Sequence, residues 1–571
     1  MIKYLRECGE SAVQGFPFCV IGAGAGGISL AIALARRGQR VLLLDGGDWG
    51  ESADVADAYL GQAAKPHPSV DEYRRQRFGG TTHLWGGRCV PYDPLDFEAR
   101  THVPHSGWPI AADELGRYLP QAMHYCDAGE TDFSVDALAG RKKPMFADLG
   151  MLSPDLREGI ERYSLPTDFG RKFRDELKNS PLVQVLLRAR CTSLSVSPDG
   201  ARVLAVEVSD GSRRMKIQAA RIVLCGGGIE TTRLLLTARR QAPGWSRFDA
   251  SLGRYYGCHY DLIFGSVAFR DDKPSFDFEK TVDGVYARRR LQFSADLLQQ
   301  HALLNSAFRL HFPPYADPSH GSGVMSTIFL AKSVLSSEYQ AILNHGQAAS
   351  TARPSVAAHL RNVVTDSPSV FRFGYDWLTK RKLAERKLPY TLVRNRNGTY
   401  PFEFNSEQVP SESNRIELTD ATDHLGMPRV SIHWQLTPDD VRSGVESFLL
   451  LKRLLDSTPS VRLEFDVGEL KERVAAALPV GGHHIGSTRM GRSAADSVVD
   501  ADCRLHGVEN LFVASSSVFP TTSHANPTLT IVALALRLAD QLARTADQAA
   551  RAESTAPFIS DSSRSTSVPS R

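Results

Sequence analysis

Apolar runs and glycine-rich turns alternate in the first fifty residues of the chain. The apolar runs over 18–21 and 41–44 are typical of buried parallel strands. The stretch 28–35 between them is almost entirely apolar and predicts a helix, which Gly38 is placed to end as a C-cap. The pattern therefore predicts a βαβ unit over 18–47 and, with it, an α/β fold.

Three glycines occupy the turn between the first strand and the helix. Gly22, Gly24 and Gly27 have the spacing G-x-G-x-x-G, and Asp45 follows the second strand. In this arrangement Gly22 allows the tight turn, Gly24 lets a pyrophosphate approach the backbone, and Gly27 lets the helix pack closely on the strand. The helix N-terminus offers amide donors to phosphates, and Asp45 can accept hydrogen bonds from a ribose diol. We therefore predict a dinucleotide site, which on these residues alone is for NAD or FAD.

The hydrophobic period changes after residue 182. Apolar and polar residues alternate over 183–196 and 201–219, which predicts an antiparallel meander. A further strand, glycine turn and helix are expected over 221–236, with Gly226 in the turn. Strand-like and helix-like runs then mix over 255–480, which indicates a second, substrate-facing α+β domain built on an antiparallel sheet backed by helices.

Composition changes this picture only slightly. The chain has 571 residues, of which 42% are hydrophobic and 23% charged, as in a globular protein of two or more domains. The net charge of +3 gives no reason to expect nucleic acid as a partner. Eight cysteines without C-x-x-C spacing make zinc, iron–sulfur and c-type haem sites unexpected, so no metal is predicted. No secretory signal and no membrane span are expected, and the predicted location is the cytoplasm.

A glycine-rich loop over 77–97 is a candidate ligand contact. Two Gly-Gly pairs flank a short polar and aromatic segment, and without Cβ atoms they can lie flat against a planar ligand. Trp85 argues against a plain surface loop, whereas His83 is open to three readings: a flavin attachment point, a polar contact or a surface residue. The candidate residues of this loop are Gly79, Gly80, Thr81, His83, Trp85, Gly86 and Gly87.

The C-terminal part of the chain carries the candidate chemistry. A short buried strand is expected over 510–514, and a long apolar helix over 527–540 that begins at Pro527. Asn526 precedes this helix, where it could be an N-cap or a functional side chain. His483 is the first of two adjacent histidines in a glycine-rich turn, a position also compatible with a surface residue.

Several of these segments together resemble the glucose–methanol–choline (GMC) family of flavin oxidoreductases. The resemblance rests on the N-terminal fingerprint and on the segments GGTTHLWGG, SGWPI, GGGIETTRLLL, HHIG, VVDADCRLHGVENLFV and NPTLTIVALALRLAD, in this order. Within the family, the chain is most similar to the side near pyranose oxidase and the C-glycoside 3-oxidases. The segment 255–480 is matched weakly, and in this family that part varies with the substrate.

The resemblance implies a catalytic pair. The family histidine lies three residues before the glycine of the turn, which places it at His483, and its partner just before the last helix corresponds to Asn526. His524 is the alternative partner. Relatives with a histidine-linked flavin carry that histidine one place later than His83, where this chain has Leu84.

The resemblance also implies FAD as the cofactor, bound covalently or noncovalently. The backbone at Cys191 corresponds to the family position that meets the adenine. The family's acidic residue before the Ser-Val-Phe-Pro turn is replaced here by Ala514 and three serines, whose backbone amides are expected to contact the pyrophosphate or the ribityl chain. The remaining implied cofactor contacts are Ser515, Ser516, Pro527 and Thr528.

The function that follows is the oxidation of an alcohol, most simply a sugar or glycoside hydroxyl, to a carbonyl. We expect His483 to take the hydroxyl proton, Asn526 to orient the substrate oxygen, and the flavin N5 to take the hydride. The alternatives are a sterol or aliphatic alcohol substrate, or a flavin with a structural role only. Dioxygen or a separate electron acceptor would reoxidise the flavin.

The expected domain division follows the same resemblance. A discontinuous FAD-binding domain of Rossmann type comprises 1–100, 182–260 and 481–546. The substrate domain comprises 101–181 and 261–480. The polar C-terminal segment 547–571 is expected to be disordered.

Overall fold

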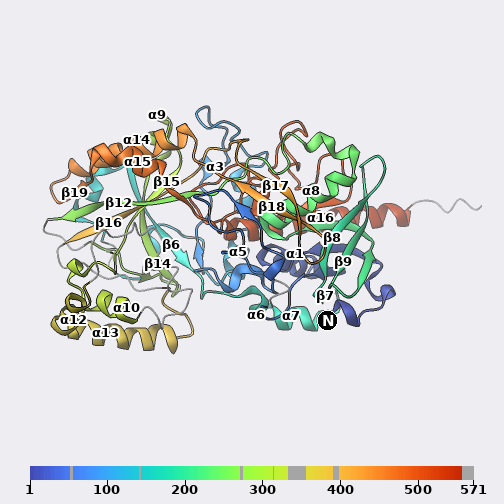
Figure 1. Cartoon of the computed structure of the whole chain (residues 1–571), viewed down its shortest axis with the longest axis horizontal. Coiled ribbons are helices and arrows are strands. Elements are labelled where there is room, and N and C mark those ends of the chain that lie inside the picture. Colours follow the sequence, from blue (N-terminus) through green and yellow to red (C-terminus); the bar gives the residue numbers. More distant parts are fainter. Residues whose placement is uncertain are drawn as a thin grey trace, which may run out of the picture.

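A computed structural model describes residues 1–51, 56–140, 143–270, 274–312, 314–331, 355–389 and 398–555. Most buried hydrophobic side chains among the described residues belong to two large cores, one beneath a parallel sheet and one beneath a larger antiparallel sheet. In Figure 1 the antiparallel sheet lies on the left and the parallel sheet on the right. This arrangement confirms the predicted α/β fold with a Rossmann-like unit and an antiparallel α+β unit.

The described residues form a six-stranded parallel sheet in the order β1-β7-β3-β2-β11-β21. Its strands are β1 (Ile2–Tyr4), β2 (Phe16–Ile21), β3 (Val41–Leu44), β7 (Val183–Leu187), β11 (Ala219–Leu224) and β21 (Leu511–Val513). Strands from the beginning, middle and end of the chain are thus neighbours, so that three distant loops meet at one edge. This edge lies at the carboxyl ends of the strands, where open parallel sheets bind their ligands.

The predicted βαβ unit comprises β2, α1 (Ala25–Ala35) and β3. Gly22 has a φ of +104°, and a Cβ on Gly27 would lie 1.8 Å from the Gly22 carbonyl oxygen. Any side chain at Gly27 would therefore push the helix away from its strand. Gly38, beyond the helix end, has the left-handed φ of +80°.

Helix α16 (Pro527–Thr555) packs against α1 and continues well past the predicted end at 540. Its first sixteen residues face the core almost completely, and Leu529, Val532 and Leu536 are buried. The extra turns include 547–555, which the sequence assigned to a disordered tail. The remainder of that predicted tail, 556–571, lies outside the described residues.

Two small sheets flank the parallel sheet. The predicted meander is present as the antiparallel strands β8 (Arg190–Val196), β9 (Val203–Ser209) and β10 (Arg214–Ile217). A second small sheet comprises β17 (Arg415–Thr422), β18 (Pro428–His433) and β4 (Gln62–Ala63). Helix α8 (Gly227–Gln241) follows β11, as predicted, and packs against strands of both small sheets.

The larger sheet contains nine strands among the described residues and pairs antiparallel. Its main order is β19 (Val461–Glu464), β12 (Tyr260–Phe269), β16 (Thr399–Ser406), β15 (Ser306–Leu310), β14 (Tyr286–Phe293), β6 (Leu156–Tyr163) and β5 (Arg88–Cys89), with β13 (Glu279–Lys280) and β20 (Leu478–Pro479) paired at its sides.

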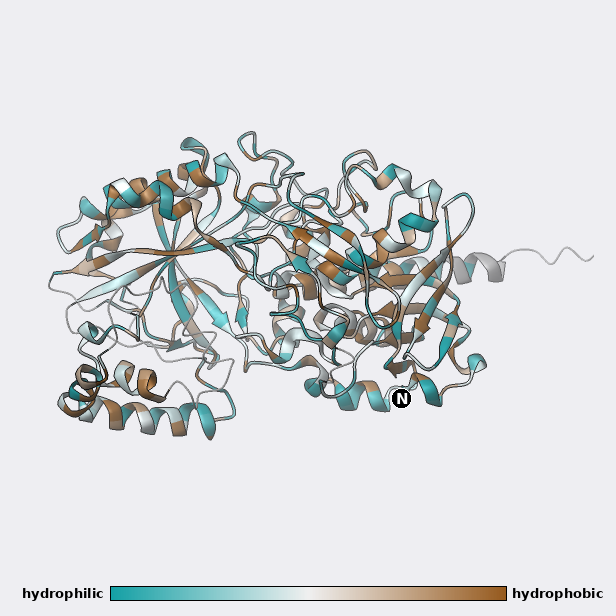
Figure 2. Ribbon diagram, viewed as in Figure 1, coloured by the Kyte–Doolittle hydropathy of each residue, from teal (hydrophilic) through white to brown (hydrophobic). Residues whose placement is uncertain are grey.

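Helices cover both sides of this sheet. Helices α14 (Pro438–Asp456) and α15 (Val467–Ala475) lie above it in Figure 1, and α10 (Gly323–Ala331), α12 (Val356–Thr365) and α13 (Ser367–Trp377) form a lobe below it. Figure 2 shows these surface helices with alternating hydrophobic and hydrophilic segments, as expected for helices that bury one face. In the described part of the chain, no helix is both long and apolar enough to cross a membrane.

The segment 101–181 contributes to both units. Helix α5 (Leu119–Tyr125) packs against α16, and the side chains of Trp108 and Phe169 join the core beneath the parallel sheet. Strand β6 from the same segment lies in the antiparallel sheet. The remaining short helices of this part are α3 (Pro94–Phe97), α4 (Ala112–Gly116), α6 (Phe169–Lys172) and α7 (Arg174–Asn179), and α9 (Ala295–Gln300) follows β14.

Candidate active site

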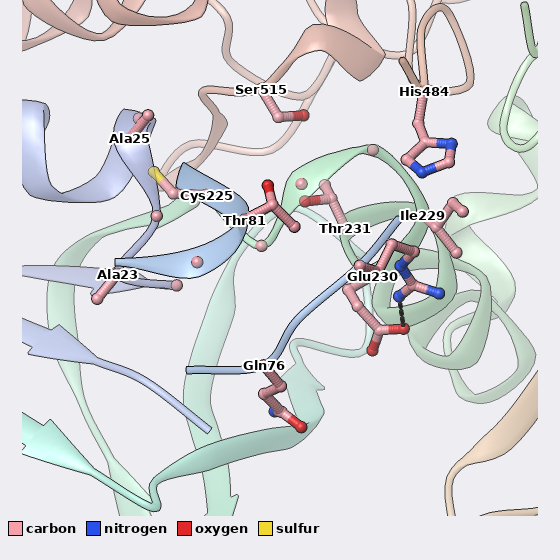
Figure 3. Close-up of a pocket in the computed structure, with 18 of the residues that line it drawn as sticks. Ala23, Ala25, Gln76, Thr81, Cys225, Ile229, Glu230, Thr231, His484 and Ser515 are labelled. Atoms are coloured by element: carbon pink, nitrogen blue, oxygen red, sulfur yellow. Dashed lines mark hydrogen bonds and ion pairs between the residues drawn. The ribbon is translucent and has the colours of Figure 1, made fainter. Parts of the chain in front are cut away.

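A cavity of about 230 Å³ lies at the carboxyl edge of the parallel sheet, between the N-termini of α1 and α8 (Figure 3). We call it the cofactor cavity. It extends from the glycine fingerprint to the turn that carries His483 and His484. The predicted residues that line it are Gly22, Gly24, Asp45, Gly80, Thr81, Trp85, Cys191, Gly226, Ser515, Ser516, Pro527 and Thr528.

The fingerprint glycines have different surroundings. A Cβ on Gly24 would meet no atom within 4 Å, so it would project into the cavity. A Cβ on Gly22 would lie 2.6 Å from the Cys225 carbonyl oxygen, and Gly27 packs against Gly22 as described above. Gly24 therefore keeps space open for a ligand, whereas Gly22 and Gly27 allow close packing of the chain itself.

The Asp45 carboxylate holds the two turns beside the cavity together. It accepts hydrogen bonds from the backbone amides of Ala23 (2.8 Å) and Gly47 (2.7 Å). Burial raises the pKa of Asp45, although these two hydrogen bonds oppose the shift. Each oxygen keeps a further lone pair, so a ribose hydroxyl could still donate to it.

Four predicted cofactor residues line neither this cavity nor the second one described below: Gly27, Gly79, His83 and Gly87. The His83 side chain lies near the Gly80 carbonyl oxygen (2.9 Å) and the Glu51 carboxylate (3.2 Å) instead. Gly79 and Gly87 have positive φ angles and pack closely on Asp168 and Ser164, so they shape the loop. Gly86 lines the second cavity and not the first.

Buried charges line the wall next to α8. Arg74 donates to one Glu230 carboxylate oxygen (2.5 Å) and Arg190 to the other (2.8 Å). Burial alone would raise the pKa of Glu230, but Arg233, Arg190 and Arg74 together lower it to about 2. Sequence reasoning missed these arginines, because a lone arginine in a turn or strand carries no recognisable pattern.

The cavity suits an adenine dinucleotide with two phosphates. Its wall carries Arg74, Arg75, Arg77 and Arg190 against the two carboxylates of Asp45 and Glu230. Arg75 and Arg77 are paired with Glu51 (3.1 Å) and Asp168 (3.7 Å), so the open space at Gly24 and the helix N-termini are the features that favour a bound pyrophosphate. The residues present therefore fit FAD, which would extend from Asp45 toward His483.

The predicted catalytic pair comes together although its members are 43 positions apart. The Asn526 Nδ2 lies 3.4 Å from the His483 Nε2. The other ring nitrogen of His483, Nδ1, lies 2.6 Å from the Nε2 of His259, a fully buried residue just before β12. Burial, His483 and Arg88 lower the pKa of His259 well below its usual value, so His259 is neutral.

These contacts bear on two alternatives that the sequence left open. The Asn526 Oδ1 has no hydrogen-bond partner among the described residues, so this side chain turns toward His483 and does not cap α16. His524 instead lies within hydrogen-bonding distance of Asp93 (3.1 Å) and Gln292 (2.7 Å), and it lines neither cavity.

A second cavity of about 280 Å³ adjoins the first at His483, and we call it the substrate cavity. His483 lines both cavities, and Asn526 lines the second. The wall is formed mainly by the antiparallel sheet and is strongly polar. Its charged and polar members include Arg88, Asp261, Arg288, Arg309, Arg381, Glu403 and Asn405.

Ion pairs fix the polar wall. Arg309 donates to Glu161 (2.7 Å) and to Glu403 (2.6 Å), both in the antiparallel sheet. Arg88 is the second cation at Glu161, at 2.7 Å. Because these groups are held by one another, the wall presents hydrogen-bonding groups in fixed positions.

Comparisons with known proteins show the family of the chain. The family model "GMC oxidoreductase" matches residues 410–535. The 6'''-hydroxyparomomycin C oxidase of Streptomyces lividus is 34% identical over 546 residues, which are 91% of this chain and 90% of that protein. The 2-methyl-1,2-propanediol dehydrogenase of Mycolicibacterium austroafricanum is 23% identical over 91% of this chain and 94% of its own.

A further relative matches only part of the chain, and a solved structure has the same fold. A C-glycoside 3-oxidase of Arthrobacter globiformis is 39% identical over 120 residues, which are 20% of this chain and 21% of that protein. The solved structure of a fungal aryl-alcohol oxidase has the same fold, with a TM-score of 0.52 and 13% identity over 93% of this chain and 99% of its own. The chain belongs to the GMC oxidoreductase family of FAD-dependent enzymes, which oxidise CH–OH groups of alcohols and sugars.

Proposed function

We propose that this protein oxidises a hydroxyl of a sugar or glycoside to a carbonyl, with His483 as the general base and Asn526 as the residue that orients the substrate oxygen. The observation that carries the proposal is the position of His483. Its ring lines the cofactor cavity and the substrate cavity, 3.4 Å from the Asn526 amide. A base at this junction can reach a hydroxyl whose carbon faces the bound cofactor.

The proton arrangement around His483 supports this role. For Nε2 to accept the hydroxyl proton, the ring proton must be on Nδ1. The neutral Nε2 of His259 lies 2.6 Å from that nitrogen and can accept this proton in a hydrogen bond. His259 therefore acts as a positioning residue, which selects the reactive tautomer of His483 and stabilises the imidazolium formed when the substrate proton arrives.

Asn526 complements the base without competing for the proton. A carboxamide is neutral and donates through Nδ2 while its Oδ1, shielded from solvent, lacks a partner among the described residues. A substrate hydroxyl that gives its proton to His483 can accept from the Asn526 Nδ2, and a neighbouring hydroxyl of the same substrate can donate to the Oδ1. Bound FAD supplies the acceptor for the hydride that leaves the same carbon.

The wall of the substrate cavity favours a polyhydroxylated substrate. Arginine, carboxylate and amide groups around the cavity can pair with several hydroxyls, whereas a sterol or a long aliphatic chain would strip water from them without replacement. The relatives named above include enzymes whose names specify 6'''-hydroxyparomomycin C and a C-glycoside. Four wall arginines face the wall carboxylates Asp261 and Glu403 and, behind Arg88 and Arg309, the buried Glu161, so cations still outnumber carboxylates and we propose a neutral or anionic sugar and not a polycationic one.

The proposal also covers the domain division, the electron acceptor and the compartment. The FAD-binding domain comprises 1–100, 182–260 and 481–546, and 261–480 builds the substrate domain together with 101–181, part of which also packs against the FAD-binding domain. Dioxygen or a separate acceptor reoxidises the flavin, and peroxide formation distinguishes the two. The eight cysteines are free and buried, which suits a reducing compartment such as the cytoplasm.

The experiment that tests the proposal follows the visible absorbance of the flavin after anaerobic mixing with a panel of sugars, aliphatic alcohols and steroid alcohols. The wild-type enzyme should bleach with at least one sugar. His483→Ala should keep its FAD and lose this bleaching by a factor of roughly 10² or more. Near-normal bleaching in that variant would refute the assignment of the base, and bleaching only with aliphatic or steroid alcohols would refute the substrate class.

A further inference from the structure

His484 lies beside the proposed base and lines the cofactor cavity (Figure 3). Its Nδ1 lies 2.8 Å from the Tyr256 hydroxyl. Its Nε2 is shielded from solvent and has no hydrogen-bond partner among the described residues. The backbone here is fixed as well, because the Ser516 hydroxyl donates to the His484 carbonyl oxygen (2.6 Å).

His484, Tyr256 and His67 form a chain of hydrogen bonds, and the positions of its hydrogens can be derived by starting from His67. The His67 Nδ1 lies 2.8 Å from the Pro68 carbonyl oxygen, which can only accept, so Nδ1 carries a proton. His67 is 1% exposed, and burial lowers its pKa, so the ring is neutral and its Nε2 holds a lone pair. That lone pair accepts the Tyr256 hydroxyl proton at 2.9 Å.

The direction of the His67–Tyr256 hydrogen bond determines which nitrogen of His484 carries the proton. Burial raises the pKa of Tyr256 well above its usual value, so the phenol keeps its one proton, which is already donated to His67. Its oxygen must therefore accept from the His484 Nδ1–H. Burial, Arg74 and His67 lower the pKa of His484 well below its usual value, which leaves a lone pair on Nε2.

The opposite orientation is unfavourable. If Tyr256 donated to His484, the His67 Nε2 would have to donate to Tyr256, and His67 would carry protons on both nitrogens. A charged imidazolium would then be buried with no carboxylate among its hydrogen-bond partners. The chain His67–Tyr256–His484 therefore has one favoured direction and ends in a fixed acceptor.

We infer that the His484 Nε2 accepts a hydrogen bond from an N–H or O–H donor on the isoalloxazine–ribityl half of FAD, and that Tyr256 and His67 hold it in the accepting tautomer. The fixed acceptor belongs to the cofactor cavity, and His484 does not line the substrate cavity. A cofactor donor would satisfy a solvent-shielded nitrogen that the protein leaves unpaired. This inference goes beyond the proposed function, because it requires bound FAD but not His483 as the base.

The test measures release of FAD from the purified holoenzyme into buffer without FAD, followed by the rise of free-flavin fluorescence. His484→Phe removes the acceptor and should speed release by roughly three- to tenfold, the equivalent of one hydrogen bond. Tyr256→Phe removes the hydroxyl that holds His484 in the accepting tautomer, and it should speed FAD release when His484 is present. In the His484→Phe background the same substitution should have no further effect, because no acceptor remains to be oriented.

Tyr260→Phe is the matched control, because this buried phenol donates to the Asp440 carbonyl oxygen (3.0 Å) and lines neither cavity. It should leave FAD release unchanged. The inference is refuted if His484→Phe releases FAD at the wild-type rate, or if the Tyr256→Phe effect persists undiminished in the double variant. If a His484 variant does not fold, the shift of the flavin absorption band in Tyr256→Phe relative to Tyr260→Phe decides the matter. The His483→Ala experiment above tests the base separately.

Discussion

The Nδ1 of His483 and the Nε2 of His259 lie 2.6 Å apart, and their ring centroids are separated by 4.4 Å. The two residues are 224 positions apart in the chain. Gly257 and Ile485 form an isolated bridge that brings the two segments together. The proposed base is thus held by a second imidazole, which is fully buried and has an unpartnered Nδ1 among the described residues.

The first prediction concerns this pair. His259→Phe removes the acceptor for the His483 Nδ1–H and frees the tautomer of His483. We expect kcat to fall roughly ten- to a hundredfold, the usual range for a residue that orients a reactive group; because His259 also lines the substrate cavity, KM changes too, and the pH profile of kcat is the decisive measurement. Stopped-flow measurement of anaerobic flavin bleaching, over a range of pH, gives the rate and its pH profile.

A conservative variant distinguishes orientation from packing. His259→Gln keeps an amide oxygen that can accept from His483, so it should recover part of the lost rate and return the pH profile toward that of the wild type. His102→Ala is a suitable control, because this half-buried histidine contacts the Leu303 carbonyl oxygen (3.1 Å) and lines neither cavity. Equal activity in His259→Phe and the wild type would show that His483 needs no partner.

The second prediction separates two fingerprint glycines. Gly24→Val places a side chain in the open part of the cofactor cavity, so the protein should fold but lose FAD. Gly27→Ala places a Cβ 1.8 Å from the Gly22 carbonyl oxygen, so it should lower the thermal midpoint of the whole protein. Flavin content per protein and the melting midpoint, measured on both variants, check this. Full flavin content in folded Gly24→Val would contradict the assigned path of the cofactor.

The fold could be predicted, and the proposed catalytic pair could be named, because both depend on short local patterns. The strand–glycine–helix signal of β2 and α1 spans a few residues, and His483 and Asn526 each lie in a distinctive segment of the family. His259, Arg74 and Arg190 could not be found this way. Each is a single residue without a pattern, and its role exists only after long-range strand pairing has placed it beside a cavity.

His83 and α16 show two other limits of the sequence. His83 belongs to the predicted loop, but only the turn geometry decides that its ring points to Glu51 and Gly80 and away from the cavity. Residues 547–555 are polar and predicted disorder from composition. In the structure they continue a long helix whose apolar beginning is buried, because a helix already nucleated gains one hydrogen bond for each added residue.

The third prediction concerns the buried carboxylate of Glu161, which supports two wall arginines. Burial alone would raise the pKa of Glu161, but Arg309 and Arg88 lower it to about 2. Glu161→Gln leaves both guanidinium groups short of one negative charge and should cost about 3–5 kcal/mol at neutral pH. Because the carboxylate has a lower pKa in the folded state than in the unfolded one, this stabilisation is complete above the unfolded value of about 4.5.

The stabilisation by Glu161 should decrease as the pH falls. As the pH falls from about 4.5 toward 2, the wild type loses the contribution of Glu161, so its thermal midpoint should approach that of Glu161→Gln. Glu176→Gln is the control, because its ion pair with Arg36 is exposed and should contribute at most about 1 kcal/mol. If the difference in thermal midpoint between the wild type and Glu161→Gln stays constant down to the lowest pH, the ion pairs of Glu161 are not the cause of that difference.

The last prediction concerns the charge of the substrate. Arg88, Arg288, Arg309 and Arg381 line the substrate cavity, against Asp261 and Glu403 in the wall and Glu161 behind Arg88 and Arg309. At neutral pH a neutral glycoside should therefore have a kcat/KM roughly tenfold or more above that of an aminoglycoside of similar size, since each uncompensated charge contact costs about 1 kcal/mol or more. Added salt should raise kcat/KM for the aminoglycoside and leave that for the neutral glycoside unchanged, because only the first is opposed by charge repulsion. Arg381→Gln should reduce the difference in kcat/KM between the neutral glycoside and the aminoglycoside, without loss of FAD. Preferred oxidation of the aminoglycoside, with a rate that falls as salt is added, would mean that the wall attracts cations and that the proposed substrate class is wrong.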